Sequence, residues 1–366
     1  MADLLKNIYN LEYLKNIAED FQKVYSKFSI DEFLKSTMDE TWDDLELKGR
    51  MRQITLNLGK FLPSDYSEAI DVIDKVVGNY GSWLEGFSLF FPDFVEVYGL
   101  DDENFDISVA ALERYTSVAS AEFAVRPFII KYEERMMAVM YEWSKSENED
   151  VRRLASEGCR PALPWAQALP KFKKDPAPIL PILERLKTDS SVWVRKSVAN
   201  NLNDISKTCP ELAAKLAKDW YGKDERTDWI VKHGCRTLLK KGNRDVLAIF
   251  GFGDAEAVDA DGFSLVADSV AIGGDITFSF EVLVKAATKV RLEYGIDYVK
   301  SGGKRNRKIF QISEISFGAN ERKLYTRKHS FADVSTRKHY AGVHSVTLIV
   351  NGAERGTLDF EVTSGC

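Results

Sequence analysis

Three basic residues recur along the middle of the chain at a spacing that could build a surface for phosphate groups. Arg152, Arg195 and Lys232 each follow an apolar residue, at intervals of about 40 residues. A repeat of this length, with an apolar, a basic and then a small residue, is typical of HEAT-type helix pairs. Stacked pairs place equivalent positions on one face, so the three side chains would form a basic stripe. Their basic neighbours in the repeats are Arg153, Lys196 and Arg236.

The distribution of charge also indicates a local site for a polyanion. The chain of 366 residues has a net charge of -6, which as a total would argue against a nucleic-acid ligand. Residues 1–110 carry a net charge of -12, however, and residues 151–244 carry +10. Such asymmetry favours one basic binding region over a uniformly basic protein. Taken alone, a basic segment is explained equally well by solvated helix faces.

An irregular loop is expected between two of the repeats. Six of the ten prolines lie between Pro161 and Pro181, and proline interrupts helices by removing a hydrogen-bond donor. The segment carries Trp165 together with the basic residues Arg160, Lys171, Lys173 and Lys174. Because loops on a rigid scaffold often carry function, this loop is a candidate part of a site.

The elements that would position these residues fall into two domains. Residues 1–250 are predicted to be a solenoid of HEAT-like helical repeats, since segments such as 65–77 and 128–144 have apolar residues at three- and four-residue spacing. Residues 251–261 are expected to be a linker. Residues 262–366 alternate apolar and polar residues, and Asn351-Gly352 is a strong hairpin signal. About seven strands of this kind predict an all-β immunoglobulin-like sandwich, which gives a multidomain α plus β protein. The clearest strand segments are 276–282, 289–294, 346–350 and 357–362.

The predicted sandwich has a basic region of its own. Residues 285–340 carry a net charge of +9, and the densest part, residues 300–308, is interpreted as a flexible loop between strands. Lys304, Arg305 and Arg307 are its candidate phosphate contacts. A solubilising hairpin tip would explain this segment alone, but beside a basic solenoid a second phosphate contact is the better interpretation.

Several kinds of chemistry have no motif in this chain. It contains no dinucleotide fingerprint, P-loop, HExxH or GxSxG motif. The four histidines have no carboxylate or cysteine at ligand spacing, so neither a metal nor a cofactor is expected. The four cysteines lie far apart, as expected for reduced thiols in a cytosolic protein. No apolar run approaches the roughly 18 residues of a membrane span, and no secretory signal is visible. We therefore expect a cytoplasmic monomer, associated with the nucleoid when it binds DNA.

Residues 152–239 resemble the AlkC branch of the HEAT-like-repeat DNA alkylation-repair glycosylases, which is related to AlkD. The likeness rests on three stretches, at residues 151–165, 191–204 and 229–236. The carboxy-terminal sandwich is similar to the immunoglobulin-like extension found in some AlkC proteins.

This resemblance implies a monofunctional DNA glycosylase. Its ligand would be double-stranded DNA containing cationic alkylated bases such as 3-methyladenine and 3-methylcytosine, engaged without a deep base-flipping pocket. Matching the motifs places the site at Glu157, Trp165 and Asp204, with Glu122 as a further member. Asp204 would position water, Glu157 would stabilise a cation, and Trp165 would contact the sugar or the base.

Each of these site residues has a structural alternative. Asp204 could be a solvated or capping carboxylate, and Glu157 could form a surface ion pair with Arg153 at i,i+4 spacing. Trp165 could be a packing anchor, and the preference of acidic residues for helix amino termini would explain Glu122. Repeat packing is the better explanation for Trp193 and Trp229. For the whole protein, the alternative is a non-enzymatic HEAT-repeat scaffold that binds a protein partner.

Overall fold

The computed structural model describes residues 4–80, 88–334 and 337–364. The chain divides into two compact units. The first comprises residues 1–209 and 222–234, and the second comprises residues 210–221 and 235–366. In the described part of the chain, no helix is long and apolar enough to cross a membrane.

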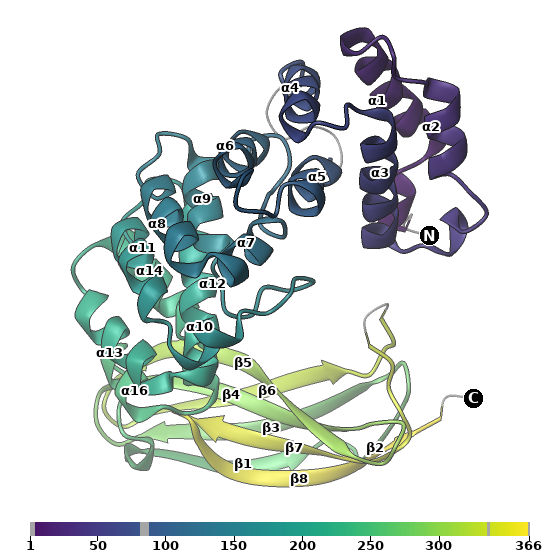
Figure 1. Ribbon diagram of the computed structural model, residues 1–366. Coiled ribbons are helices and arrows are strands. Elements are labelled where there is room, and N and C mark those ends of the chain that lie inside the picture. The colour runs from purple at the N-terminus through teal and green to yellow at the C-terminus, as the bar shows by residue number, and fades with distance from the viewer. Residues whose placement is uncertain (1–3, 81–87, 335–336, 365–366) are drawn as a thin grey trace. The chain divides into compact units, whose positions relative to one another are not determined.

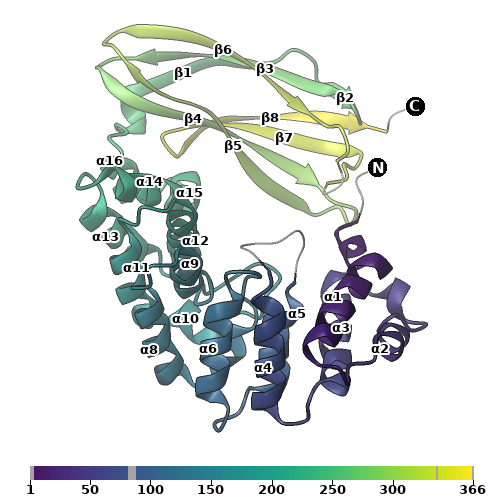
Figure 2. The same cartoon turned by 90° about the horizontal axis from the view of Figure 1, so that it is seen from above.

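The first unit is helical, and helices α1 to α12 follow one another along a curved row (Figures 1 and 2). Its α-helices are α1 (Leu11–Val24), α2 (Ile30–Thr37), α3 (Leu47–Phe61), α4 (Tyr66–Val77), α5 (Phe90–Tyr98), α6 (Phe105–Tyr115), α7 (Val125–Lys131), α8 (Glu133–Trp143), α9 (Glu149–Glu157), α10 (Pro170–Lys174), α11 (Leu180–Leu186), α12 (Val192–Thr208) and α14 (Glu225–Gly234). Short 3-10 helices are η1 (Leu5–Ile8), η2 (Trp42–Asp44) and η3 (Ala177–Ile179).

Two predicted features of this unit differ from the structure. The periodic segment 128–144 is two helices, because the backbone of Tyr132 leaves the helical region (φ -126°, ψ 48°) between α7 and α8. The proline-rich segment is not one long irregular loop, since Pro170 starts α10 (Pro170–Lys174) and η3 and α11 follow from Ala177. Proline is tolerated in a first helical turn, where its missing N–H would have no intrahelical partner.

The second unit combines α-helices with a β-sandwich (Figure 1). Its elements are α13 (Pro210–Trp220), α15 (Arg236–Lys240), α16 (Arg244–Ile249), η4 (Ala255–Ala257), β1 (Val258–Leu265), β2 (Ser269–Ala271), β3 (Asp275–Val284), β4 (Thr288–Val299), β5 (Arg305–Phe317), β6 (Glu321–Ser330), β7 (Gly342–Val350) and β8 (Ala353–Thr363). One sheet has the order β1-β3-β6 and the other β2-β8-β7-β4-β5. All pairs are antiparallel except β2 with β8.

The alternating apolar residues of the sandwich face a common core between the sheets. The predicted strand segments lie in β3, β4, β7 and β8. Asn351 and Gly352 have positive φ angles of 45° and 78°, as a tight hairpin turn requires. β1 starts at Val258, inside the segment expected to be a linker, and β5 starts at Arg305, so residues 305–308 of the expected basic loop are strand.

A buried histidine links the two sheets of the sandwich. His329 of β6 contacts two tyrosines of β4, with its Nδ1 3.0 Å from the Tyr294 hydroxyl and its Nε2 2.6 Å from the Tyr298 hydroxyl. Burial disfavours the charged imidazole and lowers the pKa of His329 to about 4. The folded protein therefore holds this side chain in its neutral form at neutral pH.

Acid is expected to destabilise the sandwich through His329. Between pH 6.5 and pH 4, His329 is protonated in the unfolded chain but stays neutral in the folded chain. The free energy of unfolding should therefore fall by about 3 kcal/mol across that window and change no further below it on account of this group. Denaturant unfolding at several pH values measures the slope, and His329→Gln should flatten it. An unchanged slope in this variant would assign the acid sensitivity to other groups.

Candidate functional site

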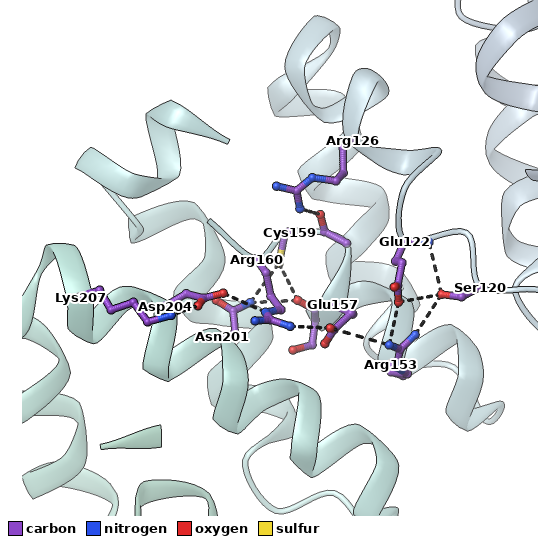
Figure 3. A network of polar contacts seen from close by, with 12 residues as sticks. Ser120, Glu122, Arg126, Arg153, Glu157, Cys159, Arg160, Asn201, Asp204 and Lys207 are labelled. Carbon is purple, nitrogen blue, oxygen red and sulfur yellow. Dashed lines mark hydrogen bonds and ion pairs between the residues drawn. The ribbon is translucent and has the colours of Figure 1, made fainter. Parts of the chain in front are cut away.

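Two buried carboxylates meet on one arginine at the carboxyl end of α9 (Figure 3). Arg160 donates from Nη1 to Glu157 Oε1 at 2.6 Å and from Nε to Asp204 Oδ2 at 2.9 Å. Lys207 binds the other oxygen of Asp204 at 2.9 Å. The side chains of Glu157, Arg160 and Asp204 are 7%, 8% and 1% exposed, so these pairs are inside the protein.

A second arginine extends this network to Glu122 (Figure 3). Arg153 Nη2 lies 2.7 Å from Glu122 Oε2 and 3.8 Å from Glu157 Oε1. Its Nη1 donates to Ser120 Oγ at 3.0 Å, and its guanidinium lies 4.3 Å from the Trp193 ring centroid. The predicted i,i+4 pair of Arg153 with Glu157 is present, but it is buried and belongs to a network.

Helices α9 and α12 position the carboxylates. α9 starts after Asn148 and α12 after Ser191, whose side chains accept from backbone N–H groups of the first turn. α12 packs against α9 and against α14. Asn201 of α12 donates to the carbonyl of Ser156 in α9 at 2.9 Å. Asp204 lies inside α12, which continues to Thr208, so it neither ends nor caps the helix.

Three carboxylates and three cations alternate along this network, and their formal charges cancel. Burial opposes the charged form of Arg160, but the carboxylates of Glu157 and Asp204 outweigh that effect and raise its pKa above the usual value. Arg160 is therefore a permanent cation between the two carboxylates. Charge-assisted hydrogen bonds of this kind fix geometry as well as charge. The network can hold carboxylates in a defined place for a developing positive charge.

Trp165 is exposed. Its side chain is 70% accessible to solvent, which does not fit a packing anchor. Its backbone has φ 63°, a left-handed conformation uncommon for a residue other than glycine. Lys48 of α3 donates to the Trp165 carbonyl at 3.0 Å. Trp193 and Trp229 are also 41% and 40% exposed, so they are only partly packed between repeats.

Several of the arginines predicted to bind phosphates have partners inside the protein. Arg152 pairs with Asp189 at 2.7 Å and donates to the carbonyls of residues 146 and 147. Arg195 donates to the carbonyls of residues 189 and 190. These precede it by six and five positions, as residues 146 and 147 precede Arg152. The arginines at this repeated position thus hold the loops that precede α9 and α12. Arg153 and Arg160 are buried in the network.

The lysines predicted to bind phosphates are better placed for an external ligand than these arginines are. Lys196 and Lys232 are exposed on α12 and α14, and Lys171, paired with Glu133 at 3.1 Å, is 78% exposed. Arg236 is partly exposed in α15 of the second unit. In the sandwich, Lys304 is exposed. The exposed Arg305 donates to Ser345 Oγ and the Val343 carbonyl, and Arg307 pairs with Asp297 and Glu354.

Three residues of the site were missed by the sequence analysis. Lys207 follows Asp204 by three positions, a helical spacing that could have indicated it. Ser120 precedes Glu122 by two positions. Arg126 of α7 donates to the carbonyls of Gly158 and Gln167; it is fully buried and gives no such signal beyond being a cation in an apolar helix.

The thiol of Cys159, close to the network, is held in an unreactive state. Burial raises the pKa of the Cys159 thiol to about 12, which keeps it protonated. In the described ranges, no group of three or more histidine, cysteine, aspartate or glutamate residues could hold a metal ion.

Comparisons with known proteins agree with this fold. The profile of the DNA alkylation repair enzymes matches residues 110–238, which include the ion-pair network. The profile of the C-terminal Ig-like domain of the uncharacterised protein YhaZ matches residues 259–364. The uncharacterised YhaZ of Bacillus subtilis (strain 168) is 46% identical over 362 residues, covering 99% of this chain and all of that protein.

A solved structure covers the same span. The alkylpurine DNA glycosylase AlkC of Pseudomonas fluorescens, bound to DNA containing an abasic site analog, is 38% identical, with a TM-score of 0.92. The match covers 99% of this chain and all of that one. The chain therefore belongs to the DNA alkylation repair enzymes. Within that family it is of the AlkC and YhaZ type, in which an Ig-like domain follows the helical repeats.

Proposed function

We propose that this protein is a monofunctional DNA glycosylase that removes cationic alkylated bases, such as 3-methyladenine and 3-methylcytosine, by hydrolysing the N-glycosidic bond. The observation that carries the proposal is the buried network in which Arg153 and Arg160 hold Glu122, Glu157 and Asp204. The family, and the likeness to a glycosylase bound to DNA, support the same ligand for this chain.

The proposed chemistry needs a negative charge more than it needs an acid. A base alkylated on a ring nitrogen is already cationic and leaves as a neutral molecule, so it requires no proton. The sugar develops oxocarbenium character as the bond to the base breaks. Asp204 positions the attacking water, and Glu157 stabilises the positive charge of the sugar and base. The water gives its oxygen to the sugar carbon and its proton to a carboxylate or to solvent.

Trp165 is assigned to contact with the nucleotide. An exposed indole can stack on a sugar or a cationic base through its negative ring face. Its exposure on an irregular loop suits a lesion engaged at the protein surface, without a deep base-flipping pocket. Lys207 is assigned to holding Asp204, with which its ammonium group pairs. The proposed hydrolysis needs no lysine nucleophile, so strand cleavage through a Schiff base is not expected.

A base-release assay tests this function. On DNA treated with a methylating agent, the wild-type protein should release 3-methyladenine and 3-methylcytosine and leave abasic sites that break only under alkali. DNA that contains uracil, an uncharged base, should release nothing. DNA binding should weaken steeply with salt, because phosphate contacts release counterions. No release of any methylated base, with binding that is insensitive to salt, would favour the scaffold alternative.

A further inference from the structure

A further buried arginine beside the ion-pair network has no part in its ion pairs. Arg126 of α7 is 0% exposed, yet among the residues that the structure describes no carboxylate lies within ion-pair distance of it. Its hydrogen bonds go to two backbone carbonyls. Nη1 donates to Gly158 at 2.8 Å, and Nε donates to Gln167 at 2.5 Å. The first carbonyl directly follows Glu157, and the second lies two residues after Trp165.

Burying this cation is unfavourable, which makes packing alone a poor explanation for it. Burial lowers the pKa of Arg126 to about 10, so desolvation works against its charge. Its Nη2 finds no hydrogen-bond partner among the described atoms. The carboxylates of Asp204 and Glu122 favour its charge from beyond ion-pair distance, and its Nη1 also meets the carbonyl of Gly158, which caps the carboxyl end of α9. The carbonyl groups there present the negative end of the helix dipole.

Helix α7, which carries Arg126, packs closely against the end of α9. A movement of Arg126 would therefore displace both the end of α9 next to Glu157 and the loop of Trp165. A Cβ at Gly158 would lie 2.6 Å from Val125 Cγ1, which shows how closely α7 approaches the end of α9. On the other side, Trp165 keeps an uncommon backbone conformation with φ 63°. Such a conformation persists only where the surrounding contacts hold it. The carbonyls of Trp165 and Gln167 are both held by cations from outside the loop, Lys48 and Arg126.

We propose that Arg126 is a positioning residue, which fixes the exposed indole of Trp165 relative to Glu157 by tying the loop to the end of α9. This role rests on the proposed function. The hydrogen bonds of Arg126 go to two backbone carbonyls and its side chain is fully buried, so we assign it no contact with the reacting atoms. Its effect on the reaction should therefore pass through Trp165.

A double-mutant cycle with Trp165 tests this coupling. In single-turnover assays at saturating alkylated DNA, Arg126→Gln should slow release of 3-methyladenine about 10- to 100-fold, since small displacements of aligned groups have effects of this size. In a Trp165→Ala background, adding Arg126→Gln should slow release by less than about twofold. A full additional loss in that background would overturn the proposal.

A matched control separates positioning from loss of stability. Arg50 is another buried arginine of the same unit, and it donates to the Lys6 carbonyl at 3.1 Å. Arg50→Gln should destabilise the protein while leaving the single-turnover rate within about twofold of the wild type. An equal loss of rate in both variants would overturn the specific role of Arg126. If Arg126→Gln does not fold, Arg126→Lys takes its place in the same cycle.

Hydrogen exchange in the free protein gives a readout that does not depend on activity. Amides of residues 163–169 should exchange at least about tenfold faster in Arg126→Gln than in Arg50→Gln, because the loop loses its attachment. Equal exchange in the two variants would show that Arg126 does not hold the loop. If the wild type releases no base, the proposed function fails together with the effect on rate, and the exchange result still decides whether the attachment exists.

Discussion

Replacing Asp204 by asparagine is expected to slow base release by ~100- to ~1000-fold in single-turnover assays, with little change in affinity for DNA. Losses of this size are typical when a positioned acid–base or electrostatic group is removed. The substitution keeps the shape of the side chain and one oxygen that Arg160 can still reach. It removes the negative charge, which the departing cation and the attacking water require, and it turns the other acceptor oxygen into an NH2 group.

The geometry around Asp204 makes this variant informative. Both oxygens of the carboxylate are engaged, one by Arg160 at 2.9 Å and the other by Lys207 at 2.9 Å. An amide can accept from one of these donors but presents its NH2 group to the other. The free energy of unfolding should fall modestly, by about 1–3 kcal/mol, because one buried partner is lost. The loss of rate should be much larger than this loss of stability would explain.

Asp93 offers a matched control for this experiment. It is a buried aspartate of α5 that accepts from Arg52 at 2.8 Å, outside the network. Asp93→Asn removes another buried carboxylate that binds an arginine, and it should leave the rate of base release unchanged. Wild-type activity in Asp204→Asn would remove Asp204 from the mechanism and transfer the role to Glu157.

The sandwich was largely predictable from sequence, and the reason is physical. Alternation of side chains with a period of two leaves few arrangements in which all apolar residues of 276–282 and 346–350 are buried. Asn351-Gly352 adds a turn that needs positive φ angles, and the structure has them. The start of β1 at Val258 was not predictable, because Asp259, Asp261 and Gly262 hide its alternation.

The repeat pattern predicted the helices but not what the repeated arginines do. Arg152 and Arg195 occupy equivalent positions, as their spacing indicated. Each donates to the carbonyls five and six residues before it, so the recurrence also has a structural cause. A sequence shows that a basic residue recurs, but it does not show whether the guanidinium turns toward its own backbone or toward solvent.

For the candidate site, sequence likeness selected three carboxylates but gave no information on the residues around them. Glu122, Glu157 and Asp204 do meet in one network, though 82 residues separate the first from the last. Their cationic partners could not be assigned from spacing alone. Arg160 was expected at a phosphate, and the structure instead places it between two carboxylates. Long-range pairs of this kind depend on how α9 packs against α12, which local patterns do not encode.

Replacing Arg160 by methionine is the second substitution expected to have a large effect. It leaves Glu157 and Asp204 buried without their shared cation, and breaking one side of a buried ion pair costs about 3–5 kcal/mol. The free energy of unfolding, measured with denaturant, should fall by that amount. Base release should fall as well, because the two carboxylates would repel each other and move apart or bind protons.

Replacing a comparable arginine in the sandwich distinguishes the loss of base release from the loss of stability. Arg291 is 4% exposed and binds both Glu293, at 2.6 Å, and Glu314. Arg291→Met should therefore be destabilising to a similar degree, while the protein that remains folded should release base at the wild-type rate. Equal losses of rate in the two variants would mean that instability, not the position of the carboxylates, limits the reaction.

Neutralising the carboxylates should restore stability in the Arg160→Met background but not activity. Removing all the charges of a buried network is often close to neutral for stability, whereas removing one partner is not. Arg160→Met combined with Glu157→Gln and Asp204→Asn should therefore regain most of the lost free energy of unfolding and remain inactive. If the triple variant stayed as unstable as Arg160→Met, the loss would come from packing around residue 160. Recovery of stability without recovery of base release would show that the charges of this network are maintained for the reaction and not for the fold.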